Sequence, residues 1–213
     1  MNRYWIVTAA HCVDDVDSSR SKVRVGEHNQ ESDEEAEHTD IQVNETIYHE
    51  GYTGRPEYDY DIAVLRLAEP IDFQPHVVPI CLPPDNYDFT GKTGTVTGWG
   101  HERAGGRRTM ILKQVNAPIL SNEKCTEMFR SNSNYDDITD RMVCAGISNG
   151  GRDTCQADSG GPLVSRLDNG RFALAGVTSW GHGCGDKNQP GVYARVTELK
   201  DWVVEKTDYY GKP

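Results

Sequence analysis

The sequence lacks any long apolar run. No stretch stays apolar over the roughly 20 residues that a membrane-spanning helix requires. The first residues, MNRYWIVTAAHC, lack the positively charged start, long apolar core and small-residue cleavage site that follow one another in a secretory signal peptide. These residues read as buried structure from the outset, so we expect the chain to begin in the middle of a domain.

Positive charge is scarce. Lys and Arg number 22 against 33 Asp and Glu, which gives a formal net charge of -11. Nucleic acids and anionic membranes are bound by positive patches, so no nucleic acid and no membrane is expected as a partner. The acidic residues gather between Glu27 and Asp40, which indicates a solvated loop or, as the sharper alternative, a calcium site.

The sequence also lacks the CxxC pairs and the Cys/His spacings of zinc sites, so a zinc site is not predicted. Its 6 cysteines favour a disulfide framework in a secreted protein. Their positions alone leave the connectivity open. They are Cys12, Cys81, Cys125, Cys144, Cys155 and Cys184.

The sequence does contain many short runs with β-branched or alternating apolar residues, separated by turns. Such runs predict an all-β fold, either a sandwich or a pair of barrels. The predicted strands are KVRVG, DIQVNETIYH, DIAVLRL, GTVTGWG, GPLVSRL and RFALAGVTSW. Asp168-Asn169-Gly170 predicts a hairpin between the last two of these runs.

Two segments predict helices. LSNEKCTEMF has Ser121 placed as N-cap and Glu123 in the first turn. TELKDWVVEKT has one apolar face, and Thr197 is placed as its cap. The proline-rich stretch VVPICLPPDN, residues 77–86, predicts a crossover between two halves of the chain.

Three residues carry candidate chemistry: His11 in TAAHC, Asp61 in DYDIAVLRL and Ser159 in ADSGGP. A serine hydroxyl is a poor nucleophile until a base, most often histidine, takes its proton, and a buried carboxylate orients that histidine. Taken singly, each residue has a simpler explanation as a packed histidine, a turn-capping aspartate or a serine in a small-residue turn. Together they indicate nucleophilic catalysis.

The motifs WIVTAAHC, DIAVLRL, DTCQADSGGPLV, VTSWG and QPGVYARV resemble those of the trypsin-like, chymotrypsin-fold serine proteases over essentially the whole chain. The resemblance implies an all-β fold of two packed antiparallel Greek-key β-barrels with a C-terminal α-helix. Residues 1–80 would form the first barrel, with His11 and Asp61 and without its opening strands. Residues 81–213 would form the second barrel and the helix, with Ser159 and the specificity pocket.

The resemblance also implies the catalytic roles. Ser159 attacks the scissile carbonyl, His11 accepts and returns the proton, and Asp61 orients His11. The backbone N–H groups of Ala157 and Ser159 form the oxyanion hole. No cofactor is needed for this chemistry. Ala157 stands where the family usually has glycine, so we expect slower turnover and weaker inhibition by tight-fitting protein inhibitors.

Asp158 corresponds to the aspartate that pairs with the new amino terminus after zymogen cleavage. The segment carrying that terminus would lie upstream of Met1, so we expect a longer parent protein to be the active enzyme and this chain alone to be inert or unstable.

Specificity for Arg and Lys follows from the same resemblance. Asp153 matches the acidic floor of the primary pocket, where an incoming Arg or Lys satisfies the buried carboxylate. The simpler alternative is that Asp153 caps a turn. Gly181 and Gly191 match the pocket walls, and the Thr154 hydroxyl adds a hydrogen-bonding group. Ser179, Trp180 and Gly181 resemble the strand that pairs with an extended substrate backbone.

By resemblance, Cys125–Cys144 and Cys155–Cys184 are disulfides, and Cys12 pairs with an upstream cysteine. Cys81 matches the cysteine that tethers a catalytic chain to its propeptide or light chain. This favours a secreted zymogen of a clotting or immune cascade that meets protein substrates and protein protease inhibitors. The alternatives are a digestive trypsin-like enzyme and a non-catalytic homologue that acts as a binding protein.

Three further features are predicted at the surface: a calcium site, a glycosylation site and an exposed loop. The acidic stretch matches the family's calcium loop, with a structural calcium ion bound by Glu27, Asn29, Ser32, Glu34 and Glu37. Asn44-Glu45-Thr46 is a glycosylation sequon. HERAGGRRT, residues 101–109, predicts an exposed loop whose arginines offer a self-cleavage or partner site.

Overall fold

The structure is a computed structural model that describes residues 2–32, 37–54, 58–101, 105–150, 158–183 and 185–207. Most of its regular structure is β-strand, arranged as a four-stranded sheet and a closed six-stranded barrel with a C-terminal helix. This confirms the predicted all-β, two-barrel fold class. Of the predicted site residues, Glu34, Asp153, Thr154, Cys155, Ala157 and Cys184 lie outside the described part of the chain.

The four-stranded sheet has the antiparallel order β1-β4-β3-β2. Its strands are β1 (Trp5–Thr8), β2 (Lys22–Val25), β3 (Thr39–Tyr48) and β4 (Ala63–Leu67). Alternating apolar residues of these strands, among them Ile41, Val43 and Leu65, bury one face against Ile71. The register of β3 against β4 shifts between Val43 and Glu45, so Asn44 is an extra, exposed residue in the strand.

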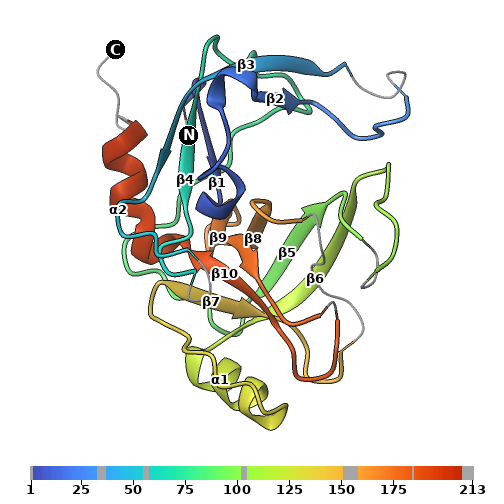
Figure 1. Ribbon diagram of the computed structural model, residues 1–213, viewed down its shortest axis with the longest axis vertical. Helices are drawn as coiled ribbons and strands as arrows, with labels where there is room; N and C mark the ends of the chain where they lie inside the picture. The colour runs from blue at the N-terminus through green and yellow to red at the C-terminus, as the bar shows by residue number, and fades with distance from the viewer. Residues whose placement is uncertain are drawn as a thin grey trace.

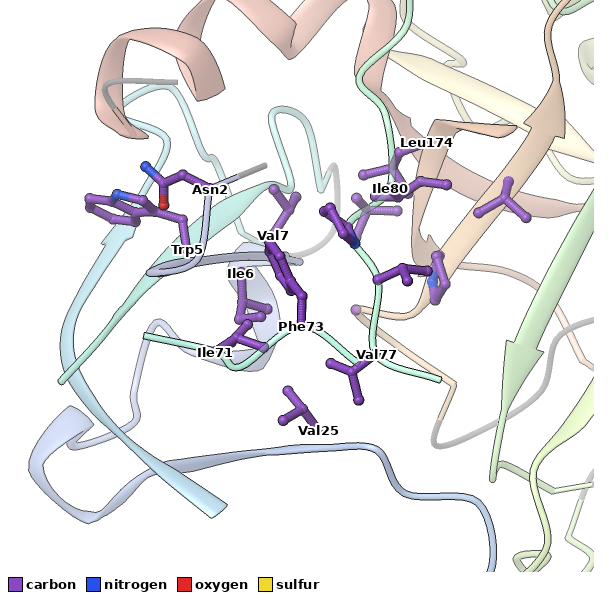
Figure 2. A pocket seen from close by; sticks show the side chains of 16 residues that line it. Asn2, Trp5, Ile6, Val7, Val25, Ile71, Phe73, Val77, Ile80 and Leu174 are labelled. Carbon is purple, nitrogen blue, oxygen red and sulfur yellow. The ribbon is translucent and has the colours of Figure 1, made fainter. Parts of the chain in front are cut away.

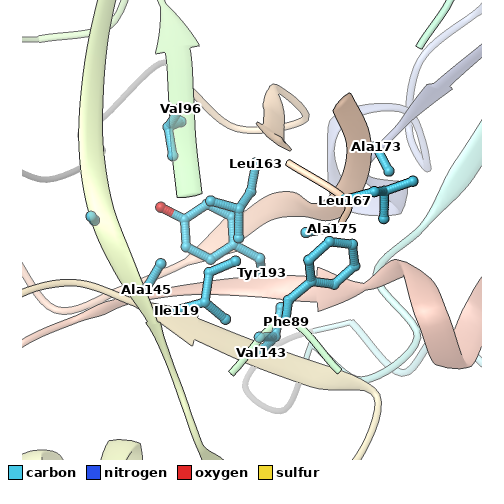
Figure 3. Close-up of a cluster of buried hydrophobic side chains, with 11 residues drawn as sticks. Phe89, Val96, Ile119, Val143, Ala145, Leu163, Leu167, Ala173, Ala175 and Tyr193 are labelled. Carbon is cyan, nitrogen blue, oxygen red and sulfur yellow. The ribbon is translucent and has the colours of Figure 1, made fainter. Parts of the chain in front are cut away.

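The barrel has the strand order β10-β7-β6-β5-β8-β9. Its strands are β5 (Thr93–Gly98), β6 (Lys113–Leu120), β7 (Met142–Ala145), β8 (Pro162–Arg166), β9 (Phe172–Trp180) and β10 (Gly191–Arg195). Figure 3 shows Tyr193, Leu163 and Ile119 pointing toward one another inside it, each at most 1% exposed. Gly94 permits this close packing, because a Cβ there would lie 2.5 Å from Cδ1 of Leu163.

The predicted hairpin at Asp168-Asn169-Gly170 joins β8 to β9. The backbone N–H of Leu167 donates to the Arg171 carbonyl at 2.8 Å. Gly170 has a φ of 83°, a left-handed conformation that glycine adopts readily. The hairpin prediction is therefore confirmed.

The two predicted helices are both present. Helix α1 (Asn122–Ser131) is capped by Ser121, whose side chain accepts from the Lys124 N–H. Helix α2 (Val196–Thr207) begins one residue before Thr197, so the prediction that Thr197 is its cap was wrong: Thr197 lies in the first turn. In Figure 1, α2 runs along one side of the molecule. Its Leu199 and Val203 pack with Ile62 and Val64 of the first half and Leu174 of the barrel.

An apolar cavity of about 310 Å³ lies between β1 and the barrel. Figure 2 shows Val7, Ile71, Phe73 and Val77 around it. The same cavity is lined by Gly160, the residue after Ser159. Within the described residues, no helix is long and apolar enough to cross a bilayer.

Candidate active site

His11 and Asp61 form the centre of the site. His11 lies in a 3-10 turn (Ala10–Cys12) that follows β1, and Asp61 lies two residues before β4. The His11 backbone N–H donates to Oδ1 of Asp61 at 2.9 Å, and Nδ1 of the His11 ring lies 2.7 Å from Oδ2. Because the Asp61 carboxylate bonds both the backbone and the ring, it fixes the imidazole with Nδ1 inward.

The barrel contributes a third bond to Asp61. Ser179, a buried residue on β9, donates from its Oγ to Oδ2 of Asp61. Asp61 is only 1% exposed, and burying a carboxylate is costly unless donors surround it. We expected Ser179 in the strand that pairs with substrate; its side chain also joins the barrel to the carboxylate of Asp61.

The surroundings of His11 strongly favour its charged form. Burial lowers its pKa, but hydrogen bonds with Asp61 and Cys12 outweigh this and raise the pKa of His11 to about 10. The Cys12 sulfur lies 3.6 Å from Nε2, on the side of the ring that faces away from Asp61.

Tyr58 is a neighbour that the sequence analysis missed. Its ring meets the His11 ring edge-on, with 5.6 Å between the centroids. Its φ of 49° lies in the left-handed region that non-glycine residues rarely adopt. Because the backbone turns this way just before Asp61, Tyr58 lies against the imidazole of His11; no spacing or motif in the sequence signals that contact.

Ser159 lies in an exposed turn against the His11 segment. Gly160 has a φ of 78°, and a Cβ there would collide with Oγ1 of Thr8 and lie 3.3 Å from Sγ of Cys12. Two backbone bonds hold the turn to β9: Gly160 N–H to the Thr178 carbonyl and Thr178 N–H to the Gly161 carbonyl, each 2.9 Å. Among the described residues, the bonds of the His11 ring reach Asp61 and Cys12 but not Ser159.

Asp158 lies in a cradle of glycines. The Gly100 N–H donates to Oδ1 of Asp158 at 2.8 Å. A Cβ on Gly98 would collide with the carboxylate, and one on Gly100 would lie 2.5 Å from Oδ1, so the cradle requires glycine at both positions. The predicted ion pair between Asp158 and an amino terminus stays a prediction.

The two predicted pocket-wall glycines face each other. A Cβ on Gly181 would lie 3.7 Å from Cα of Gly191. The preceding Trp180 stacks on Phe129 of α1, with 5.7 Å between ring centroids. Gly181 and Gly191, separated in sequence, are thus brought together at the ends of β9 and β10.

Comparison with known proteins decides the family. A family model described as Trypsin matches residues 1–203. The chain belongs to the trypsin family. The family and the relatives below make it a trypsin-like serine endopeptidase domain.

Three curated relatives match nearly all of this trypsin-family chain. It is 42% identical over 206 residues to serine proteinase stubble of Drosophila melanogaster, which covers 96% of this chain and 26% of that protein. It is 40% identical over 200 residues to serine protease filzig of the same organism, covering 93% of the chain and 12% of the relative. It is 39% identical over 206 residues to the suppressor of tumorigenicity 14 protein homolog of Bos taurus, covering 93% and 23%. The chain therefore spans a minor part of each relative's length.

One of the two expected disulfides falls within the described residues. Cys125 of α1 and Cys144 of β7 are bonded, with Cα atoms 6.1 Å apart. Both residues of the expected Cys155–Cys184 pair lie outside the described part of the chain. Cys12 and Cys81 are half-buried free thiols.

The ends of the predicted calcium loop lie close together. A Cβ on Gly26 would lie 2.5 Å from the Glu37 carbonyl. The carboxylate of Glu27 is held by Arg24, with Nη1 3.2 Å from Oε2, and by the His28 N–H at 2.9 Å. Within the described residues, no three His, Cys, Asp or Glu side chains are grouped as a metal site would require. Glu27 therefore faces a cation already, so a calcium ion at Glu27 would have to displace Nη1 of Arg24.

Proposed function

We propose that this domain hydrolyses peptide bonds with Ser159 as nucleophile, His11 as general base and Asp61 as the residue that positions His11. The supporting observation is the pair of hydrogen bonds, one from the backbone and one from the ring, between His11 and Asp61, a residue that is 1% exposed. In the neutral imidazole, a carboxylate on Nδ1 holds the tautomer in which Nε2 is the atom that takes a proton.

In the proposed mechanism, Oγ of Ser159 bonds to the scissile carbonyl carbon while its proton passes to Nε2 of His11. His11 then gives that proton to the amide nitrogen as the C–N bond breaks. A water molecule then attacks the carbonyl carbon of the acyl-enzyme and gives a proton to His11, and His11 returns a proton to Oγ of Ser159 as the ester bond breaks. The backbone N–H groups of Ala157 and Ser159 are assigned to the oxyanion, where one donor contributes about 3 kcal/mol in related sites.

For substrate specificity, we propose cleavage after Arg or Lys, with Asp153 as the acidic floor of the pocket. The facing pair Gly181 and Gly191 supports this, because neither residue carries a side chain that would block a long basic group. A carboxylate in such a pocket gains charge-assisted hydrogen bonds only from a basic side chain.

For biological setting, we propose a secreted zymogen in an extracellular proteolytic cascade, inhibited by protein protease inhibitors. The Cys125–Cys144 disulfide supports an oxidising compartment. The half-buried free Cys81 supports a tether to a propeptide or light chain. The exposed bulge position of Asn44 supports its glycosylation, and structural calcium at the 27–37 loop is proposed on its acidic residues.

The test uses the full-length protein after activation. Chromogenic peptides ending in Arg, Lys, Phe or Ala are compared between the wild type and Ser159→Ala, with a serine-directed covalent inhibitor as active-site titrant. We expect Arg and Lys substrates to be cleaved and Ser159→Ala to be inactive. Preferred cleavage of the Phe or Ala peptides would overturn the specificity, and full activity of Ser159→Ala would overturn the mechanism.

A further inference from the structure

A groove of about 810 Å³ is lined by residues that have no role in the mechanism above. It is formed by the connection between β5 and β6 and by one residue of the acidic loop. Its charged and large apolar lining residues are Glu31, Arg107, Arg108, Met110, Ile111 and Lys113.

The groove has a firm floor, because backbone bonds tie its two sides together. The Gln30 N–H donates to the Met110 carbonyl at 2.9 Å, and the Leu112 N–H donates to the His28 carbonyl at 2.8 Å. Nε1 of Trp99 donates to the same His28 carbonyl at 3.1 Å. The segment at 28–30 and the segment at 110–112 therefore hold a fixed relative position.

The groove also adjoins the turn of the nucleophile. A smaller cavity of about 90 Å³ is lined by Asp158 and by Thr109 and Lys113, and these last two also line the groove. The Thr109 N–H donates to the carbonyl of Trp99, which lies between the two glycines that cradle Asp158. The groove is therefore linked, through Thr109 and Lys113, to the cavity that Asp158 lines, and Asp158 directly precedes Ser159.

The chemistry of the groove is cationic and partly apolar. Arg107 and Arg108 are exposed, and within the described residues neither forms an ion pair with an acidic side chain. Met110 is 37% exposed and Ile111 45%. Most of this protein's surface charge is negative, since the chain carries -11, so a cationic groove stands out from its surroundings.

We propose that this groove is a second recognition surface that binds an acidic segment of the protein substrate, one carrying a large apolar residue among its carboxylates. Arg107 and Arg108 pair with the carboxylates, and Met110 and Ile111 receive the apolar side chain. Glu31 lines one side of the groove, where its carboxylate repels acidic residues of the bound segment. Naming the partner a substrate rests on the proposed function; the binding of an acidic segment does not.

The binding test uses the Ser159→Ala chain, so that no peptide is cut. A fluorescein-labelled peptide of glutamates around a central leucine is titrated by anisotropy at low and high salt, beside the same peptide with glutamines. We expect the acidic peptide to bind at least about tenfold more tightly, and added salt to weaken it. Equal affinity for the two peptides would overturn the proposal.

Charge reversal locates the binding. The double variant Arg107→Glu/Arg108→Glu should weaken binding of the acidic peptide about tenfold or more. The double variant Arg107→Gln/Arg108→Gln should weaken it by less. The matched control is Arg130→Glu, an exposed cation on α1 outside the groove, which should leave the affinity within about twofold. The same affinity in the Arg107→Glu/Arg108→Glu chain as in the control would overturn the proposal. Peptide binding as expected, together with a wild-type protein that cleaves neither Arg nor Lys substrates, would instead count against the proposed function alone.

Discussion

The Sγ of Cys12 lies 3.6 Å from Nε2 of His11, the atom that takes the proton of Ser159 in the proposed mechanism. In that mechanism, a reduced Cys12 competes with Ser159 for His11. Both the hydrogen bond and the electrostatic interaction of Cys12 raise the pKa of His11. The disulfide that the family resemblance implies for Cys12 would consume this thiol and leave Nε2 to Ser159.

Replacing Cys12 should make His11 a better base near neutral pH. In Cys12→Ala the contacts that raise the His11 pKa are reduced, so the pKa should fall below about 10. NMR titration of histidine-labelled protein measures it, with the His11 signal assigned from its loss in His11→Gln. Cys81→Ala, the other free cysteine, is the control and should leave the titration unchanged. An unaltered His11 pKa in Cys12→Ala would show that the contact between Cys12 and Nε2 of His11 does not raise this pKa.

The stability of the domain should fall in alkaline solution because of the His11–Asp61 pair. The folded pKa of His11 is raised from 6.5 to about 10, so its stabilising contribution is complete below pH 6.5 and is lost as the pH rises toward 10. Urea unfolding across this range measures the slope. In Asp61→Asn the slope should flatten, whereas the exposed control Asp201→Asn should keep it. Equal slopes of unfolding free energy against pH in the two variants would show that the His11–Asp61 pair is not the cause of the alkaline loss of stability.

Removing the Ser179 hydroxyl should reduce catalysis as well as stability. Ser179→Ala takes one donor from the buried Asp61. Hydrogen bonds to charged groups contribute about 1.5–3 kcal/mol, so kcat/KM should fall about tenfold to a hundredfold. The matched control is Ser165→Ala, which removes another buried serine hydroxyl, bonded to the Thr93 carbonyl at 2.9 Å. It should lower the melting temperature with little effect on kcat/KM; similar kinetic losses in both variants would reduce Ser179 to a packing role.

The sequence predicted six strands, and each overlaps an observed strand because its apolar residues alternate or run together over a whole buried face. Strand β6 was missed because Pro118 interrupts its pattern, and proline argues against a central strand. Strand β7 was missed because its four residues are all buried and show no alternation. Short buried strands are defined by their neighbours rather than by their own pattern.

The site divides in a similar way. His11 and Asp61 stand in short recognisable motifs, and the structure brings them together. Ser179 bonds Asp61 across 118 positions of sequence, and Tyr58 reaches His11 only through its left-handed backbone. Such contacts depend on how the sheet and the barrel pack, which no local pattern contains.

An ion pair between the two halves should govern acid stability. Nε and Nη2 of Arg141 bond Asp59 at 3.0 and 2.7 Å, and Oγ1 of Thr139 adds a third bond. Burial raises the pKa of Asp59, but these hydrogen bonds hold it below its ordinary value of 3.8. A depressed carboxyl pKa contributes stability that is complete above pH 3.8 and is lost as the pH falls through the folded pKa.

Arg141→Met should therefore destabilise the domain by about 1–3 kcal/mol at neutral pH, because it leaves a half-satisfied carboxylate. The difference from wild type should narrow as the pH falls below 3.8 and through the lowered folded pKa of Asp59, because the carboxyl then becomes protonated in both proteins. Urea unfolding at several pH values measures this, and Arg130→Met on α1 is the control. A constant difference from neutral to acidic pH would exclude the ion pair as its cause.

The contact between Arg24 and Glu27 should weaken calcium binding at Glu27. Arg24 bonds Asp40 through Nε at 2.6 Å and Nη2 at 3.0 Å, and reaches Glu27 only through Nη1 at 3.2 Å. A calcium ion at Glu27 can displace Nη1 while the Asp40 bonds remain. We expect millimolar calcium to raise the melting temperature and a chelator to reverse this. The free energy of unfolding should rise by about 2.7 kcal/mol at a hundredfold excess of calcium over Kd.

Arg24→Gln removes the competing cation and should tighten calcium binding in calorimetric titration. Glu27→Gln is the matched loss-of-ligand variant and should weaken it. Unchanged affinity in both variants would place any bound calcium elsewhere than Glu27.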